Sequence, residues 1–347
     1  MNKVTSKDVA KAAGVSRTTV SLVLNGVTNA RIPNETRTKI FKIAKELNYL
    51  PNQLAQGLKT NRSKTIAFVL PSISNPFYPY VVQGIEEVAM EHGYTVYICN
   101  TYRDPKKEKK CLEYLSQRQV DGLILSVSFK SNELIQEFIE RGVAITTFNR
   151  TLELPQADQV LVDNIHGGFL ATKYLLDLGH QRIAYLAGPM IYQSRIDRVT
   201  GYKKAHLEYG LKVDDSLIIC SDTEQEFHDQ TYDLHNGYNL GRQLLKQRMD
   251  ATAVVVINDM TAIGAIKALR EGGVRVPEDI SLVSYDNIPI ADAVEPGLTT
   301  IDQPKFERGK AAAELLIKRL EEPESQERRS VTFRPSLIIR ESCRPRG

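Results

Sequence analysis

Polar and aromatic residues directly follow several short apolar runs in the second part of the chain. Runs such as Val254–Ile257 and Ile280–Ser284 are typical of buried parallel strands, whose carboxyl ends lie at one edge of a sheet. Aromatic rings that stack, with Arg, Asp and amide groups that form directed hydrogen bonds, suit a polar small molecule such as a sugar or nucleoside. Taken singly, each such residue is more often a helix cap or a surface group, but their joint placement favours binding. The residues at these strand ends are Asn75, Phe77, Tyr78, Asn149, Arg150, Arg195, Arg198, Asn258, Asp259, Tyr285, Asp286 and Asn287.

A second group of residues, near the amino terminus, could contact a nucleic acid. Arg17, Thr18, Ser21 and Leu22 are expected on the outward face of a short helix that begins after Ser16. At the N-terminal end of such a helix, side chains reach base edges and backbone N–H groups reach phosphates. The alternative is a generic three-helix bundle without that role.

Sequence motifs of catalysis and metal binding are missing. The chain has neither the G-x-G-x-x-G of dinucleotide enzymes nor the G-x-x-x-x-G-K-[ST] of nucleotide hydrolases, and it has no G-x-S-x-G motif. The six histidines show no metal-ligand spacing, and the four cysteines form no C-x-x-C pair. We therefore expect no enzymatic activity, no metal and no cofactor.

Charge is distributed unevenly along the chain. Residues 1–64 carry twelve Lys and Arg against three acidic residues, a net charge of +9, so the remainder carries −6 of the overall +3. A basic head on an acidic body is typical of a module that binds a polyanion, because neutralised phosphates release counterions. A merely solvated basic surface is the alternative, and it is weaker over a whole segment than over one helix.

Three helices are expected to position the residues of the basic head. Thr5 and Asp8 form a capping arrangement at the start of the first helix, which Gly14 ends. Ser16 caps the second helix and Asn34 caps the third. Two short helices joined by a tight glycine-containing turn form a helix-turn-helix, whose second helix can enter a major groove. The apolar residues expected to form the core are Val9, Ala10, Ala13, Val20, Val23, Leu24, Ile40, Ile43, Ala44 and Leu47.

From residue 65 onward, apolar strand-like runs alternate with amphipathic helices, which predicts parallel sheets covered on both faces. The alternation restarts after Asp163, so we expect two α/β lobes. The fold class is therefore an all-α helix-turn-helix head followed by a two-lobed α/β domain with doubly wound parallel sheets. Strands are expected near Thr65–Leu70, Tyr94–Cys99, Gly122–Leu125, Ala144–Thr147, Arg182–Leu186, Ser216–Cys220, Ala253–Ile257 and Ile280–Ser284.

The head also resembles a known family. Residues 4–26 read VTSKDVAKAAGVSRTTVSLVLNG and residues 48–52 read NYLPN, which is similar to the head of the lac repressor and galactose repressor family of bacterial transcription regulators. The resemblance implies that Arg17, Thr18 and Leu22 read bases. Many members carry a polar side chain where Leu22 stands, so the operator sequence does not follow from relatives. The DNA-binding residues implied as a whole are Thr5, Ser16, Arg17, Thr18, Thr19, Ser21, Leu22, Asn25, Asn52, Ala55, Leu58 and Lys59.

Residues 51–64 are expected to link the head to the body. The stretch could form little more than two helical turns, which are marginal in isolation, so we expect it to fold on DNA. The family resemblance implies that Leu58, with Ala55 and Lys59 beside it, is a wedge that enters the minor groove and kinks the duplex. The alternative is an unstructured polar linker.

The body resembles the sensor domain of the same family, which shares its fold with periplasmic sugar-binding proteins. The similar segments include Asn75-Pro76-Phe77-Tyr78, Arg198-Val199-Thr200-Gly201-Tyr202 and Ser284-Tyr285-Asp286. This resemblance implies that Arg198 and Asp286 are the core effector-binding pair. The residues implied around them are Phe77, Tyr78, Arg150 and Asn258.

The expected domains are a DNA-binding head at 1–50, a hinge at 51–64 and an effector-binding and dimerisation domain at 65–347. The first lobe is expected at about 65–161 and 292–322, and the second at about 162–291 and 323–347. The chain crosses between lobes near Val160–Asn164, Leu298–Ile301 and Glu321–Glu327, the second crossing resembling that of the family.

Together these features predict a cytoplasmic, ligand-responsive repressor that binds a palindromic operator as a homodimer. A sugar, nucleoside or phosphorylated metabolite in the cleft between the lobes would set its affinity for DNA. Control by a protein coeffector is an alternative. An exported solute-binding protein is a further alternative, although it would need a signal peptide and would not explain the basic head. No apolar run is long enough to span a membrane.

Overall fold

The computed structural model describes residues 4–24, 31–49, 62–126, 132–149, 154–222, 231–247, 250–325 and 327–346. The chain divides into two compact units, Met1–Ser63 and Lys64–Gly347. Each unit has its own hydrophobic core. Within the described residues, no helix is long and apolar enough to cross a membrane.

The first unit is a bundle of three helices, α1 (Ser6–Ala13), α2 (Arg17–Leu24) and α3 (Asn34–Glu46). The apolar positions of these helices face one another because they recur at helical spacing. Gly14 adopts a left-handed conformation with φ +69°, which ends α1 and allows the tight turn into α2. The expected helix-turn-helix is confirmed. Its buried core consists of Val9, Ala10, Ala13, Val20, Val23, Ile40 and Ala44, with Leu24, Ile43 and Leu47 half-buried around it.

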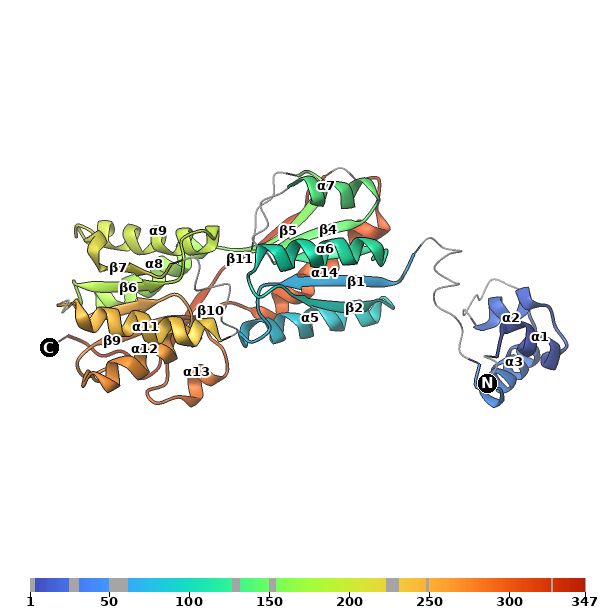
Figure 1. The fold of residues 1–347 in the computed structure, drawn as a ribbon, viewed down its shortest axis with the longest axis horizontal. Coiled ribbons are helices and arrows are strands. Elements are labelled where there is room, and N and C mark those ends of the chain that lie inside the picture. The colour runs from blue at the N-terminus through green and yellow to red at the C-terminus, as the bar shows by residue number, and fades with distance from the viewer. Residues whose placement is uncertain are drawn as a thin grey trace. The chain divides into compact units, whose positions relative to one another are not determined.

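The first lobe of the second unit is built on a sheet in which all strands run parallel. Its order is β11 (Ser330–Phe333), β5 (Ala157–Val162), β4 (Ala144–Phe148), β3 (Gly122–Leu125), β1 (Thr65–Leu70) and β2 (Thr95–Asn100). Helices α5 (Phe77–Glu91) and α14 (Lys305–Glu321) cover one face, and α6 (Pro105–Gln117) and α7 (Asn132–Glu140) cover the other (Figure 1).

The second lobe repeats this plan. Its sheet has the order β12 (Ser336–Ile338), β10 (Thr299–Asp302), β9 (Ser281–Asp286), β8 (Ala253–Val256), β6 (Ile183–Ala187) and β7 (Ile218–Cys220), with β12 antiparallel to β10. Helices α8 (Asn164–Asp177) and α9 (Gln193–Glu208) cover one face, and α11 (Tyr232–Lys246) and α12 (Asp259–Glu271) cover the other. The short elements η1 (Asp215–Leu217) and α13 (Ile290–Ala293) complete the lobe.

The central strands of both sheets are buried on both faces, whereas the edge strands β2, β11 and β12 are partly exposed. In β1, Ile66, Phe68 and Leu70 pack toward α5 and α14, whereas Ala67 and Val69 pack toward α6 and α7. This alternation explains the continuous apolar runs of the sequence. The prediction of two parallel α/β lobes is therefore confirmed.

The expected lobe boundaries are wrong in the last third of the chain. Residues 298–301 were expected to cross between lobes, but Thr299–Asp302 form β10 within the second sheet, and the chain crosses only afterwards to reach α14. Residues 321–327 were also expected to cross, but the chain stays in the first lobe until β11 has paired with β5. The crossing then lies between Phe333 and Ser336. Both errors arose because each lobe adds one more short strand before the chain leaves it.

Candidate nucleic-acid interface and ligand cavity

The start of α1 is fixed by a reciprocal cap. The Thr5 backbone N–H donates to the Asp8 carboxylate at 2.8 Å, and the Thr5 hydroxyl donates to the same carboxylate at 2.7 Å. These hydrogen bonds hold the pKa of Asp8 below its usual value. The expected capping arrangement is confirmed, and Thr5 itself is exposed.

The start of α2 is fixed by Ser16 and Thr19. The Thr19 N–H donates to the Ser16 hydroxyl at 3.0 Å, and the two hydroxyl groups share a hydrogen bond of 2.8 Å. Ser16 and Thr19 therefore hold the helix end, as expected for Ser16. Arg17 and Thr18 are exposed on the first turn that this cap orients, and Ser21 and Leu22 are half-buried beside them.

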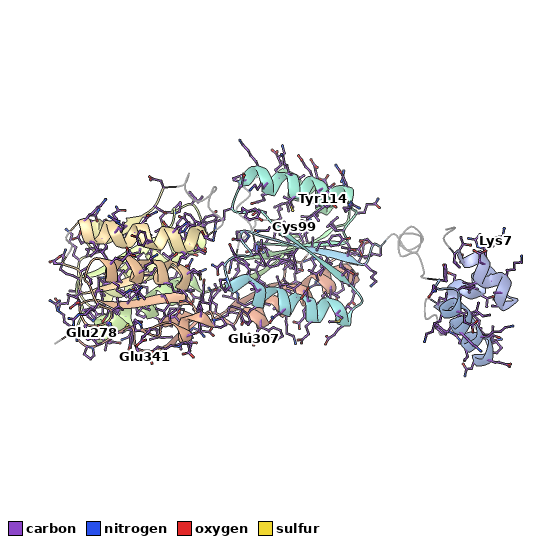
Figure 2. The ribbon with its side chains drawn as sticks, turned by 60° about the horizontal axis from the view of Figure 1, so that its bottom comes forward. Lys7, Cys99, Tyr114, Glu278, Glu307 and Glu341 are labelled. Carbon is purple, nitrogen blue, oxygen red and sulfur yellow. The ribbon has the colours of Figure 1, made fainter. Side chains whose placement is uncertain are left out.

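Both helices of the motif carry exposed basic residues. Lys7 and Lys11 on α1 are exposed, as is Arg17 on α2, and Figure 2 shows Lys7 directed away from the bundle. The helix-turn-helix thus exposes cations on both helices and short polar groups at the start of α2. Five of the expected DNA-binding residues lie outside the described residues: Asn25, Asn52, Ala55, Leu58 and Lys59.

A cavity of about 610 Å³ lies between the two lobes of the second unit. It opens at the carboxyl ends of strands of both sheets, where ligands bind in folds of this kind. Of the expected effector-binding residues, Arg150 lies outside the described residues. The other seven line the cavity: Asn75, Phe77, Tyr78, Asn149, Arg198, Asn258 and Asp286.

Arg198 is held rigidly from α9. Its Nε donates to Asn164 Oδ1 at 2.9 Å and its Nη1 donates to the Ile257 carbonyl at 2.7 Å. The guanidinium lies 3.5 Å from the centroid of the Tyr285 ring, a cation–π contact. Glycines of α8 make room for this arrangement, since a Cβ at Gly168 would lie 2.0 Å from the Arg198 carbonyl oxygen.

Asp286 ends β9 inside the cavity, with its backbone at φ +106°. Gln303 Nε2 donates to its carboxylate at 2.6 Å, and Lys305 Nζ donates to its backbone carbonyl at 2.7 Å. Burial raises the pKa of Asp286 to about 7, and the positive charge of Arg198 opposes this rise. Arg198 and Asp286 therefore interact electrostatically across the cavity. The described contacts contain no hydrogen bond between them.

Two of the expected effector-binding residues also have structural roles. The side-chain Oδ1 of Asn258 accepts from the Thr261 N–H at 2.8 Å and so caps α12. The side-chain Oδ1 of Asn75 accepts from the Phe77 N–H at 2.9 Å, and its Nδ2 donates to Asp233 at 3.1 Å. Asn258 is therefore a helix cap, the alternative role considered from the sequence, and it also lines the cavity.

Comparisons with known proteins agree with this arrangement. Residues 5–52 match the family described as "Bacterial regulatory proteins, lacI family", and residues 172–343 match "Periplasmic binding protein-like domain". The ribose operon repressor of Escherichia coli (strain K12) is 36% identical over 342 residues, covering 98% of this chain and 99% of the relative. The chain belongs to the lacI family of bacterial regulatory proteins.

Two solved structures resemble nearly the whole chain. A transcriptional regulator CelR–cellobiose complex is 32% identical with a TM-score of 0.72, over 98% of this chain and 100% of that one. The lac repressor dimer bound to operator and the anti-inducer ONPF is 27% identical with a TM-score of 0.85, over 99% of this chain and 100% of that one. The family resemblance stated from the sequence is confirmed, and the chain is a ligand-responsive, DNA-binding transcription regulator.

An ion pair that sequence reasoning missed joins the lobes of this lacI-family protein beside the cavity. Arg103 of the first lobe donates to Asp233 of α11 at 2.9 Å, and both side chains are 9% exposed. The Asn75 amide donates to the same carboxylate. Because Arg103 and Asp233 lie 130 residues apart and neither follows a recognised motif, only the structure brings them together.

Arg308 of α14 was also missed. It is fully buried, with its guanidinium 4.4 Å from the Phe148 ring centroid and 5.8 Å from that of Phe77. It donates to Asn149 and to Gln303, and Gln303 donates in turn to Asp286. Burial lowers the pKa of Arg308 to about 10. A series of hydrogen bonds therefore links Asn149 in the first lobe, through Arg308 and Gln303, to Asp286 in the second lobe.

Proposed function

We propose that this lacI-family regulator is a dimeric repressor whose affinity for a palindromic operator is set by a neutral sugar or a similar polyhydroxyl metabolite in the interlobe cavity. The proposal of a neutral ligand rests on the hydrogen-bond and ion-pair partners of the arginines that line the cavity. Arg103 is paired with Asp233, Arg195 donates to the Pro189 carbonyl at 2.9 Å, and Arg198 donates to the Ile257 carbonyl. Each guanidinium thus already has a protein acceptor.

This arrangement favours a neutral ligand over a phosphorylated one. A phosphate group would have to compete with acceptors that are already in place, and buried pairs resist such exchange. A sugar instead needs single directed hydrogen bonds and an apolar surface for its C–H face. Asp286 and Asn149 supply polar groups, and Phe77 and Tyr78 supply aromatic ones. The relative that was solved with cellobiose supports the same ligand class.

A thermal-shift panel tests the ligand class. We expect at least one neutral sugar at 100 times its dissociation constant to stabilise the full chain by about 2.7 kcal/mol. The panel pairs each neutral sugar with its phosphorylated form and includes purine bases and nucleosides. A shift produced only by the phosphorylated sugars or only by purines would overturn the proposed class. A protein coeffector is favoured instead if no small molecule shifts the transition.

We propose that Arg17, Thr18 and Leu22 read base edges in the operator. Arg17 and Thr18 are exposed on the first turn of α2, and Leu22 is half-buried on the next turn. A two-fold operator requires a dimer. The minor-groove role of Leu58, Ala55 and Lys59 stays a prediction from the sequence. Because chromosomal DNA would be its target, we further propose a cytoplasmic location.

Arg17→Ala, compared with Lys39→Ala, tests the reading face. Both variants remove one exposed charge from the head, but Lys39 lies on α3. A base-reading Arg contributes about 1–3 kcal/mol of discrimination, whereas a phosphate-directed charge contributes uniformly to all sequences. We expect Arg17→Ala to weaken binding to a library-selected duplex about tenfold more than binding to a scrambled duplex. Equal losses on the two duplexes would remove Arg17 from the reading face.

A further inference from the structure

Arg308 is a buried cation behind the aromatic wall of the ligand cavity. It lies in α14 with none of its side chain exposed, whereas the preceding residue, Glu307, is exposed at the surface of the first lobe (Figure 2). Phe77 and Phe148 line the cavity, and the guanidinium lies 5.8 and 4.4 Å from their ring centroids. Arg308 itself is not one of the lining residues. Its effect on a ligand must therefore act through its neighbours.

Two side-chain amides accept hydrogen bonds from Arg308. Its Nη2 donates to Oδ1 of Asn149 in the first lobe, and its Nη1 donates to Oε1 of Gln303, which lies on the crossing between β10 and α14. No carboxylate of the described residues pairs with the guanidinium, and its Nε has no acceptor among them. In the part of the chain that the structure describes, the two amide oxygens are thus the hydrogen-bond acceptors of this buried charge.

The guanidinium decides which way each amide points. It carries five N–H donors and no acceptor, so the amide atom that faces it has to be the oxygen. The Nε2 group of Gln303 is thereby turned to Asp286, to whose Oδ1 it donates at 2.6 Å. Nδ2 of Asn149 is turned away from Arg308 and has no acceptor among the described residues. Because Asn149 and Asp286 both line the cavity, one lobe offers a donor and the other an acceptor.

We propose that Arg308 is a positioning residue that sets the hydrogen-bond polarity of the cavity, so that Asn149 donates to an oxygen of the effector and Asp286 accepts from one of its hydroxyl groups. Only the contacts to the effector rest on the proposed polyhydroxyl ligand, because the amide orientations follow from Arg308 alone. A ligand without the oxygen opposite Asn149 would leave that donor unpaired, and sites built for hydrogen bonding reject such analogues strongly.

A double-mutant cycle on the full chain tests the amide orientation without any ligand. Asn149→Asp replaces the NH₂ group with oxygen, gives Arg308 a carboxylate and suits the left-handed backbone of residue 149, at φ +63°. We expect its effect on the unfolding equilibrium constant, measured with urea, to be at least tenfold more favourable in the unmodified chain than in Arg308→Met.

Asn164→Asp is the matched control for this cycle. Asn164 Oδ1 accepts from Arg198 at 2.9 Å, so this amide faces a different guanidinium in the same way. Its substitution should have the same effect with and without Arg308. The absence of a background effect for Asn149→Asp, or an equally large one for Asn164→Asp, would overturn the proposal.

The pH profile of Asn149→Asp alone decides the matter if Arg308→Met does not fold. A carboxylate that faces the guanidinium has its pKa lowered, so its stabilisation is complete above the unfolded value near 3.9 and is lost as pH falls through the lower folded value. The difference from the unmodified chain should then be constant between pH 5 and pH 7. A buried carboxyl turned away from Arg308 has its pKa raised, so a difference that becomes less favourable over this range would overturn the proposal.

Ligand discrimination tests the contacts to the effector. The sugar with the largest thermal shift is compared by calorimetric titration with its monodeoxy analogues. At least one analogue should bind tenfold more weakly to the unmodified chain, and this ratio should fall at least threefold in Arg308→Lys, which keeps the charge but loses the planar fork. Equal weakening of all ligands, with the ratio unchanged, would overturn the positioning role. If no sugar binds, the proposed ligand class fails, whereas the double-mutant cycle still decides whether Arg308 orients the amides.

Discussion

The two walls of the ligand cavity are held in place by different forces. In the first lobe, the rings of Phe77, Tyr78 and Phe148 pack together, with the Phe77 and Tyr78 centroids 5.2 Å apart and edge to face. In the second lobe, Arg198 and Asp286 are fixed by backbone carbonyls, a stacked ring and a neighbouring amide. Apolar packing responds little to pH or salt, whereas charge interactions respond to both. The first wall should therefore set stability, and the second should set ligand response and its dependence on pH.

The largest effect is expected from removing a ring of the first wall. Phe148 is 1% exposed and contacts Phe68, Phe77 and the Arg308 guanidinium. Phe148→Ala should lower the free energy of unfolding by about 3–5 kcal/mol, because it loses buried area and leaves a cavity. Urea unfolding at two pH values and two salt concentrations measures this loss, which should be nearly constant across them.

Tyr114→Ala is the matched control for Phe148→Ala. Tyr114 lies in the same lobe, on α6, with half of its side chain exposed, so its loss should change the free energy of unfolding by less than about 1 kcal/mol. A loss for Phe148→Ala that varies strongly with salt would contradict the packing account of the first wall.

Arg198→Ala disrupts the charge interactions of the second wall. The change removes the guanidinium stacked on Tyr285 and the positive charge opposite Asp286. We expect ligand affinity to fall about 100-fold, or roughly 2.7 kcal/mol, since the ligand loses a charge-assisted hydrogen bond. Calorimetric titration with the sugar found by thermal shift measures the change. Lys204→Ala, an exposed cation on the same helix, should leave the affinity unchanged, and equal losses in both variants would remove Arg198 from the site.

The smallest expected effect is the pH dependence that Asp286 gives the unliganded protein. Its folded pKa, about 7, lies above the value near 3.9 of an unfolded chain. Between these values the folded state keeps a proton that the unfolded state has lost, so stability falls as pH rises from 4 to 7. Asp259, with its pKa raised to about 6 by burial, acts in the same direction.

Asp286→Asn should flatten this slope, because the amide stays neutral at every pH. The difference between the two proteins in free energy of unfolding should change by about 2.6 kcal/mol from pH 5 to pH 8. His180 and His206 have lowered pKa values, and they contribute equally to both proteins. Parallel pH profiles for the variant and the unmodified chain would contradict the buried-carboxyl interpretation.

The sequence was sufficient for the architecture because its periodicities are strong. Residues 65–70 form a nearly continuous apolar run, which is typical of a strand buried on both faces. Thr5, Gly14 and Ser16 mark the ends of the head helices. The same topology places seven described site residues at one cavity, since strand ends of parallel sheets share an edge.

Pairings between distant residues could not be predicted in this way. The Arg103–Asp233 pair and the Arg308–Asn149 contact span 130 and 159 residues, and no local pattern relates their members. The crossings after β10 and β11 were misplaced for a related reason, because strands of four residues carry too weak a pattern to be separated from linkers.

The central claim is that ligand in the cavity changes the affinity of the head for DNA. It is tested most directly by fluorescence anisotropy of the full chain on a duplex selected from a random library, with and without the sugar identified by thermal shift. The account predicts at least a tenfold change in duplex affinity, about 1.4 kcal/mol, that disappears in Arg198→Ala. Equal duplex affinity with and without saturating sugar would contradict it.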